Sequence, residues 1–246
     1  MAFEWRELWC KDTVDGTVGA CFGSNGGQTY LDWLITAWGW TLAVSAVGLV
    51  IALLLGSLMG VLRTTPSKPL VMLGNAWTEL FRNMPLIVQL FLWYFVAPEF
   101  LPVLKSLPSW VVAAIGLGFF TSARISEQVR AGIQSIPKGQ TYAGLAMGLT
   151  RVQTYRYVLL PVAFRVVIPP LTSEGMSIVK NSSVAFALSV LELTQFARQA
   201  GEETSRPTEV YAMVTVAYFI SAFSVYLVAS LLERAVRVPG VAGVAK

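Results

Sequence analysis

The stretch from Trp33 to Leu62 contains no charged residue. A bilayer hydrocarbon core about 30 Å thick is crossed by about 20 helical residues, so this stretch predicts a transmembrane helix. Because it is longer than one upright helix needs, we expect tilt or an interfacial start between Trp33 and Trp40. Hydrophobic residues make up 55% and charged residues 13% of the chain. These values exclude intrinsic disorder and an ordinary soluble domain.

Four further segments are predicted to cross the membrane. The stretches between Lys105 and Arg124 and between Glu209 and Glu233 lack charges and are long enough. Two weaker segments carry charged residues or prolines, which in membrane helices usually face protein or water. The five expected spans cover residues 38–62, 75–98, 108–134, 162–181 and 208–233.

The placement of lysine and arginine predicts the orientation. The loop from Arg63 to Lys68 is basic and directly follows the first span, where the positive-inside rule is strongest. We therefore expect an all-α integral membrane protein with five transmembrane helices, its N-terminus outside and its C-terminus inside. Residues 1–29 would form an external leader, 30–238 the transmembrane domain, and 239–246 a cytoplasmic tail.

Several function classes are excluded by residues that the chain lacks. It contains no histidine, so imidazole metal ligands and histidine general bases are absent. It contains no G-x-x-x-x-G-K-[ST] loop to bind ATP phosphates. The net charge of +4 concerns membrane orientation rather than nucleic acid. We expect no metal, no cofactor, no nucleic-acid partner and no enzymatic activity in this chain.

The leader contains the only two cysteines, Cys10 and Cys21. Outside a bacterial inner membrane a disulfide is permitted, and it would close a small loop over the first span. The alternative is two free thiols, and the sequence does not decide between them.

Small residues recur every four positions in two of the expected spans. Such stripes let helix backbones approach closely in lipid. Gly56 and Gly60 form a GxxxG pair and are expected to be structural; the alternative is chance in a chain rich in glycine and alanine. The first stripe is Gly48, Ala52, Gly56 and Gly60, and the second is Ala114, Gly118 and Ser122.

Residues 136–161, between the third and fourth spans, predict two short amphipathic helices separated near Gly148 to Thr150. Their apolar faces need a surface to cover them. One interpretation is a pair of helices lying on lipid. The other is a docking surface for a cytoplasmic partner.

This loop resembles the EAA loop of ABC-importer permeases, in which E-A-A is followed by a glycine and, after nine residues, by I-x-L-P. Here Gly148 occupies the glycine position. Tyrosine replaces the glutamate and glycine replaces the second alanine. The resemblance assigns ATPase coupling to Tyr142, Ala143, Gly144, Gly148, Val158, Leu160 and Pro161.

Three longer segments are similar in sequence to polar-amino-acid importer permeases, and in particular to the glutamate/aspartate members. These segments are residues 79–95, 123–140 and 169–185. The resemblance implies a type I, methionine-importer-like fold with cytoplasmic coupling helices, in a bacterial inner membrane. It also implies alternating access and three kinds of partner: a second permease subunit, identical or not, two cytosolic subunits that bind ATP and Mg, and a periplasmic amino-acid-binding protein.

Two other function classes remain as alternatives. A self-sufficient secondary transporter would need a coupling site and usually an internal repeat, and five spans cannot form two equal halves. A membrane-embedded enzyme would need a nucleophile–base set or a metal cluster, and no such group accompanies the acidic residues.

The fourth span carries the candidate substrate path. At 100° per residue, five polar side chains fall within an arc of about 120°. A charge that faced lipid would cost about 2.5–3.5 kcal/mol, so this face is expected to line a cavity. The residues are Ser173, Glu174, Ser177, Lys180 and Asn181.

An amino-acid substrate has an ammonium and a carboxylate to satisfy. Glu174 could bind the ammonium, while Lys180 together with Arg124 could bind a carboxylate. The alternative is that Glu174 and Lys180 only pair with neighbouring helices or with the partner subunit.

Two further groups of charges are expected to be structural. Glu79 and Arg82 are three residues apart and could form an ion pair that shields both from lipid; the alternative is a role in the pathway or the subunit interface. Arg124, Glu127 and Arg130 could form a ladder of ion pairs at the inner boundary, with a carboxylate contact as the alternative for Arg124.

Overall fold

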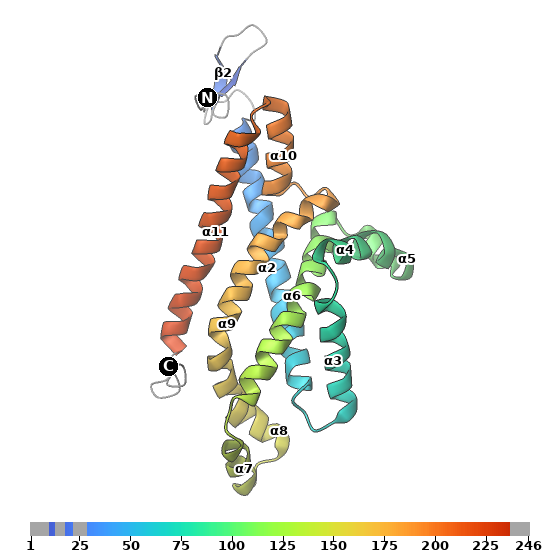
Figure 1. The fold of residues 1–246 in the computed structure, drawn as a ribbon, viewed down its shortest axis with the longest axis vertical. Helices are drawn as coiled ribbons and strands as arrows, with labels where there is room; N and C mark the ends of the chain where they lie inside the picture. Colours follow the sequence, from blue (N-terminus) through green and yellow to red (C-terminus); the bar gives the residue numbers. More distant parts are fainter. Residues whose placement is uncertain (1–9, 13–17, 22–28, 237–246) are drawn as a thin grey trace.

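The computed structural model describes residues 10–12, 18–21 and 29–236. Apart from a two-stranded hairpin in the leader, the described part of the chain is helical. The four long helices run along the length of the molecule, and the start of α2 and the end of α11 lie at opposite ends (Figure 1). The hairpin is β1 (Cys10–Asp12) and β2 (Val18–Cys21), and the long helices are α2 (Tyr30–Leu62), α6 (Ser109–Gln134), α9 (Leu160–Asn181) and α11 (Pro207–Val236).

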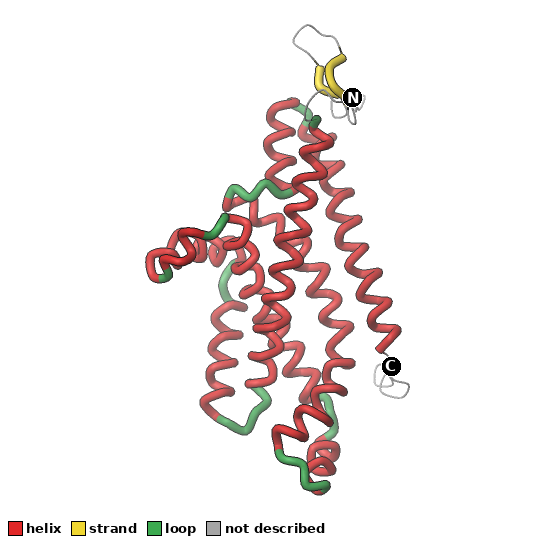
Figure 2. Tube along the Cα trace, turned by 180° about the vertical axis from the view of Figure 1, so that it is seen from behind, coloured by secondary structure: helices red, strands yellow, loops and turns green. Residues whose placement is uncertain are grey.

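Shorter helical elements connect the long helices. The view from behind shows that short loops join consecutive helices (Figure 2). Four helices of the described chain are long and apolar enough to cross a membrane, or five if one bent pair is counted as a span. The shorter elements are α3 (Lys68–Arg82), α4 (Leu86–Phe91), a π-helical turn (Leu92–Val96), α5 (Ala97–Phe100), a 3-10 turn (Pro102–Ser106), α7 (Lys138–Ala146), α8 (Arg151–Thr154), a second π-helical turn (Tyr155–Leu159), a 3-10 helix (Ser182–Leu188) and α10 (Leu193–Thr204).

The expectation of one continuous helix over residues 75–98 is wrong. The segments Lys68–Arg82 and Leu86–Phe100 meet at an angle of 106°. Pro85 precedes α4 with an extended ψ of 136° and has no amide hydrogen to continue α3. Met84, as the residue before a proline, is also disfavoured in helical conformation. Glu79 and Arg82 therefore lie in the last turn of a separate helix.

The glycine stripe of α2 lies directly against α6. A Cβ atom added at Gly56 would be 2.7 Å from the Ser122 carbonyl oxygen, and one at Gly60 would be 2.9 Å from that of Ser126. A Cβ atom at Gly118, from the other stripe, would be 3.1 Å from the Gly48 carbonyl oxygen. The two backbones are thus in contact where side chains would separate them, as the small-residue stripes lead one to expect.

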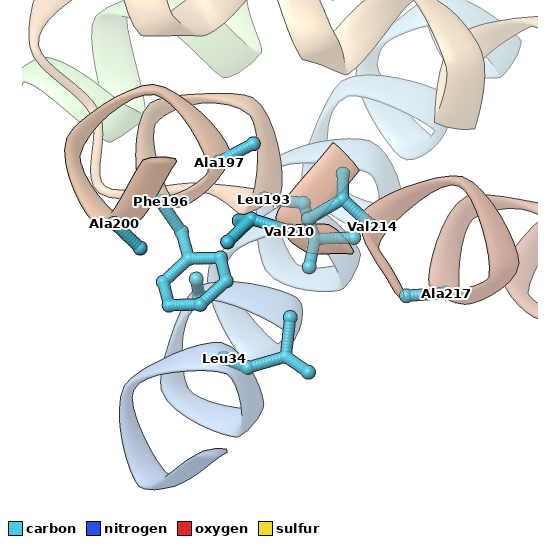
Figure 3. Close-up of a cluster of buried hydrophobic side chains, with 9 residues drawn as sticks. Leu34, Leu193, Phe196, Ala197, Ala200, Val210, Val214 and Ala217 are labelled. Carbon is cyan, nitrogen blue, oxygen red and sulfur yellow. The ribbon is translucent and has the colours of Figure 1, made fainter. Parts of the chain in front are cut away.

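Helix α10 closes one end of the bundle. Phe196, Ala197 and Ala200 of α10 are fully buried against α2 and α11. Figure 3 shows the Phe196 ring above Leu34 of α2. The pattern i, i+3, i+4, i+7 of an amphipathic helix is present at Leu193, Phe196, Ala197 and Ala200, in a segment that the five expected spans do not include.

The contact between α2 and α6 predicts different effects on stability for alanine substitutions at two glycines of α2. Replacing a glycine inside a helix by alanine normally stabilises it by about 1 kcal/mol. At Gly39 no atom lies within 4 Å of an added Cβ, so Gly39→Ala should raise the melting temperature. At Gly56 the added carbon meets backbone, so Gly56→Ala should lower stability by about 1–3 kcal/mol.

Thermal unfolding of both variants in one detergent checks this, and equal melting temperatures would contradict the contact.

Candidate functional site

A buried carboxylate on α9 is held by two side chains of α6. Glu174 is only 3% exposed. The Nε atom of Arg124 lies 3.2 Å from Oε1 and 3.0 Å from Oε2 of Glu174. The side-chain amide of Gln128 donates a hydrogen bond to Oε1 at 2.9 Å. Because a buried charge is costly unless paired, Glu174 can be buried only while α6 and α9 keep this contact.

The part of the Arg124 guanidinium that does not contact Glu174 is accessible from outside the protein. The Arg124 side chain is 45% exposed although Glu174 is buried. Only Nε takes part in the pair, and within the described residues its two terminal nitrogens have no hydrogen-bond partner. A guanidinium in this state can bind a carboxylate with two parallel hydrogen bonds.

The other four polar residues of the expected substrate path lie on the accessible side of α9. Ser173 and Lys180 are exposed, and Ser177 and Asn181 are partly exposed. Within the part of the chain that the structure describes, Lys180 forms no ion pair. The surface therefore carries two cations, Arg124 and Lys180, flanked by hydroxyl and amide groups.

A second charged cluster connects α3 to α6. Both terminal nitrogens of Arg82 are engaged: Nη2 lies 3.0 Å from Oε2 of Glu79, and Nη1 contacts Glu127. The pair expected between Glu79 and Arg82 is therefore present and is extended by Glu127. The expected ladder along one helix does not form, because Arg124 and Glu127 each pair with a different neighbouring helix.

The loop between α6 and α9 contains the two expected helical segments. Gly148 has a φ of +84°, a left-handed conformation that only glycine adopts without strain. The Leu149 amide donates to the Gly144 carbonyl at 3.1 Å, which completes a Schellman turn at the end of α7. Thr150 then caps α8 in a reciprocal pair with Gln153.

The surface of this loop is divided between exposed and buried residues. Tyr142 is 65% exposed and Ala143 is exposed, whereas Gly144 packs on Thr154, whose Cγ2 would lie 2.9 Å from an added Cβ. The second segment runs through the π-helical turn directly into α9. As a result, Val158 and Leu160 are partly buried, and Pro161 lies in the first turn of α9.

The two cysteines lie opposite each other in the backbone of the hairpin. Cys10 of β1 pairs in antiparallel register with Cys21 of β2. Directly paired antiparallel residues are about 4.5–5.5 Å apart between Cα atoms, within the range that disulfides span. Only the backbone of this hairpin is described and not its side chains, so the disulfide stays a prediction.

Sequence reasoning missed one buried carboxylate, Glu192. It is 0% exposed and accepts hydrogen bonds from the amides of Thr194 and Gln195, both at 2.9 Å, at the start of α10. The hydroxyl of Tyr218 on α11 donates to it at 2.6 Å. The Leu193 amide donates to Thr41 of α2 at 3.1 Å. This cluster joins α10 to both α2 and α11.

Residues 52–238 match the family described as binding-protein-dependent transport system inner membrane component. The chain belongs to this family. It is 44% identical over 227 residues to the glutamate/aspartate import permease protein GltJ of Escherichia coli strain K12, covering 87% of this chain and 92% of that protein. It is 34% identical over 194 residues to a probable glutamine ABC transporter permease, GlnM of Bacillus subtilis, covering 79% and 88%.

Solved structures agree with this assignment. An amino acid ABC transporter crystallised with histidines superposes with a TM-score of 0.74 at 28% identity, covering 84% of this chain and 95% of that one. The inward-facing MetNI methionine ABC transporter gives 0.74 at 25% identity, covering 84% and 97%. The expected methionine-importer-like fold is confirmed, and the chain is a multi-pass permease of the amino-acid ABC importer class.

Because Glu192 is buried, its ionisation should contribute measurably to the pH dependence of the folding stability. Desolvation raises the pKa of its carboxyl above the usual 4.5, although hydrogen bonds from Thr194 and Tyr218 oppose the shift. The folded state therefore keeps its proton to higher pH than the unfolded state, and stability falls as pH rises through the raised pKa. Glu192→Gln should make the melting temperature less dependent on pH above about 4.5, where the unfolded state has already lost its proton.

Glu202→Gln is the matched control, because Glu202 is exposed on the same helix. The difference in melting temperature between low and high pH should shrink for the first variant and not for the second. Equal pH dependence in both would mean that Glu192 is not the group responsible.

Proposed function

We propose that this chain is the transmembrane subunit of an ATP-driven importer for glutamate and aspartate in a bacterial inner membrane. Two observations support an acidic substrate. The chain is 44% identical to a glutamate/aspartate import permease. The accessible face of α6 and α9 carries two cations, Arg124 and Lys180, and one carboxylate, Glu174, which pairs with Arg124, so one positive charge is in surplus. An acidic amino acid has one ammonium and two carboxylates, and a face with surplus positive charge suits it.

In this proposal Arg124 is the substrate contact and Glu174 positions it. Glu174 fixes Nε and so orients the guanidinium plane, leaving the terminal nitrogens for a side-chain carboxylate. Lys180 lies on the same face and supplies the second cation, with Ser173, Ser177 and Asn181 as polar groups along the path. The single observation that carries the proposal is the half-exposed guanidinium on a buried carboxylate.

The exposed polar face also supports a second permease subunit. A charged side chain facing lipid costs about 2.5–3.5 kcal/mol or more, so Arg124 and Lys180 need a wet cavity around them. A second permease that packs against this face would enclose such a cavity, and rocking of the two subunits would open it to alternate sides. The same complex would contain two cytosolic subunits that bind ATP and Mg and a periplasmic amino-acid-binding protein.

The site is tested by uptake in proteoliposomes that contain the complete transporter and its binding protein. Arg124→Lys keeps a charge beside Glu174 but loses the guanidinium fork. It should lower ATP-dependent glutamate uptake by about tenfold, the loss expected for one charge-assisted hydrogen bond. Lys105→Gln, outside the helix bundle and paired with Glu99, should leave uptake unchanged.

ATP hydrolysis stimulated by the binding protein should persist in Arg124→Lys. A parallel loss of hydrolysis and uptake would assign Arg124 to the structure instead of the substrate. No ATP-dependent uptake by the unaltered complex would overturn the proposed function itself, and uptake driven by an ion gradient alone would favour a secondary transporter.

The loop between α6 and α9 is proposed to dock the ATPase, through the exposed face of α7 that includes Tyr142 and Ala143. The turn at Gly148 sets the angle between α7 and α8. Gly148→Val would place a β-branched residue in a left-handed conformation, which costs about 1–2 kcal/mol or more. We expect this variant to insert in the membrane but to lose the ATPase in a pull-down.

Gly39→Val is the control, because Gly39 on α2 lies outside this loop, with no atom within 4 Å of an added Cβ and with no left-handed backbone. It should retain the ATPase. Normal recovery of the ATPase with Gly148→Val would count against the loop as the docking element.

A further inference from the structure

An apolar cavity of about 610 Å³ lies between α2, α9 and α11. Its hydroxyl groups are already satisfied: Thr172, Ser221 and Ser224 each donate to the carbonyl oxygen four residues earlier in their own helix. The indole nitrogen of Trp38 donates to Ser221 at 2.7 Å. The lining therefore offers no free polar group to an amino acid, whereas a hydrocarbon chain needs none.

The cavity is a groove that is open along one side. At one end Ser221 is 3% exposed and a Cβ at Gly175 would be 3.2 Å from Val225, although Leu42, which also lines the groove, is 44% exposed. At the opposite end Phe164 is 61% and Leu232 is 58% exposed. A narrow apolar chain could therefore enter along the exposed side, and the end at Phe164 and Leu232 is the more open one.

The groove is at least as long as one membrane leaflet is thick. It extends along α9 from Phe164 to Gly175, along α11 from Ser221 to Leu232 and along α2 from Trp38 to Leu53. At 1.5 Å per residue the first two segments are about 16 Å long and the third is about 22 Å long. Half of a hydrocarbon core about 30 Å thick is about 15 Å. The open end lies toward α7, α8 and the end of α11 (Figure 1).

The groove faces away from the polar face of α9. At 100° per residue, the α9 residues that line it, including Phe164, Ile168 and Gly175, fall within an arc of about 100°. Ser173 and Lys180 lie on the other side of the helix, about 150° and about 130° from the centre of that arc. Because the polar face needs protein or water, the groove faces lipid.

A positively charged side chain lies at the open end of the groove. Arg165 follows Phe164, is exposed, and within the described chain forms no ion pair or hydrogen bond. Glu233 and Arg234 follow Leu232 on α11 and offset each other. The mouth of the groove thus has one surplus positive charge, which is complementary to a phosphate.

We propose that this groove binds one phospholipid, with an acyl chain inserted between α2, α9 and α11 and the phosphate at Arg165. The lipid is a bound structural ligand and is not the transported substrate. It would fill the space that remains between α11, α2 and α9 beside the direct contact of α11 with α9 at Gly175 and Val225, and so support the packing of α11.

The test uses the complete transporter in vesicles of phosphatidylethanolamine and phosphatidylglycerol that contain a phosphatidylglycerol with a photoreactive group on its acyl chain. Cross-links should concentrate on the lining residues of α9 and α11. Ala229→Phe fills the groove and should reduce this labelling at least about fivefold, with Leu231→Phe as control, because Leu231 is 64% exposed and outside the groove. Arg165→Gln should weaken retention of phosphatidylglycerol about tenfold.

Two results would overturn the proposal. Labelling spread evenly over lining and exposed residues, unchanged by Ala229→Phe, would mean that lipid contacts this surface without occupying the groove. Absence of lipid labelling at the lining residues of α9 and α11 would mean that no acyl chain occupies the groove. Uptake assays are not needed, so this outcome is independent of the substrate assignment.

Discussion

The backbone contact between α2 and α6 determines where most other elements can lie. Helices in lipid gain little from apolar burial, so close packing and hydrogen bonds hold them together. At the foot of α2 this contact brings Arg63 to Ser126 of α6, at 3.3 Å, and Arg63 also donates to Asn75 of α3 at 2.8 Å. Near the other end Thr41 of α2 accepts the amide of Leu193. The positions of α3 and α10 therefore both follow from the same pair of helices.

Helix α6 presents different chemistry to its two sides. Its small residues and main-chain oxygens face α2, whereas Arg124 and Gln128 face α9. The ion pair with Glu174 can be buried because α6 supplies both a charge and an amide to it. This arrangement leaves the unused part of the guanidinium at the surface of the protomer, where a charged side chain is stable only if water or another subunit covers it.

Features that depend on local spacing could be predicted from the sequence. The long apolar helices, the stripe containing Gly56 and the turn at Gly148 each follow from residue types at fixed intervals. The break before Pro85 was missed because the apolar residues after it supported a continuous span. The partner of Glu174 could not be predicted, because Arg124 is fifty residues away and several cations were equally available. Glu192 was missed because α10 was not predicted. Without a predicted helix start at this position, there was no reason to expect an N-cap residue there.

The continuity of α8 with α9 connects the loop to the polar face mechanically. The helical segment from Arg151 to Leu188 is unbroken, although it includes a π-helical turn and three prolines. Such a turn adds one residue per hydrogen-bonded ring and is frequent at functional sites. A force applied at α8 therefore reaches Glu174 through helical backbone and not through a flexible linker. Because Glu174 holds Arg124, tilting α9 would also turn the guanidinium that we propose binds the substrate.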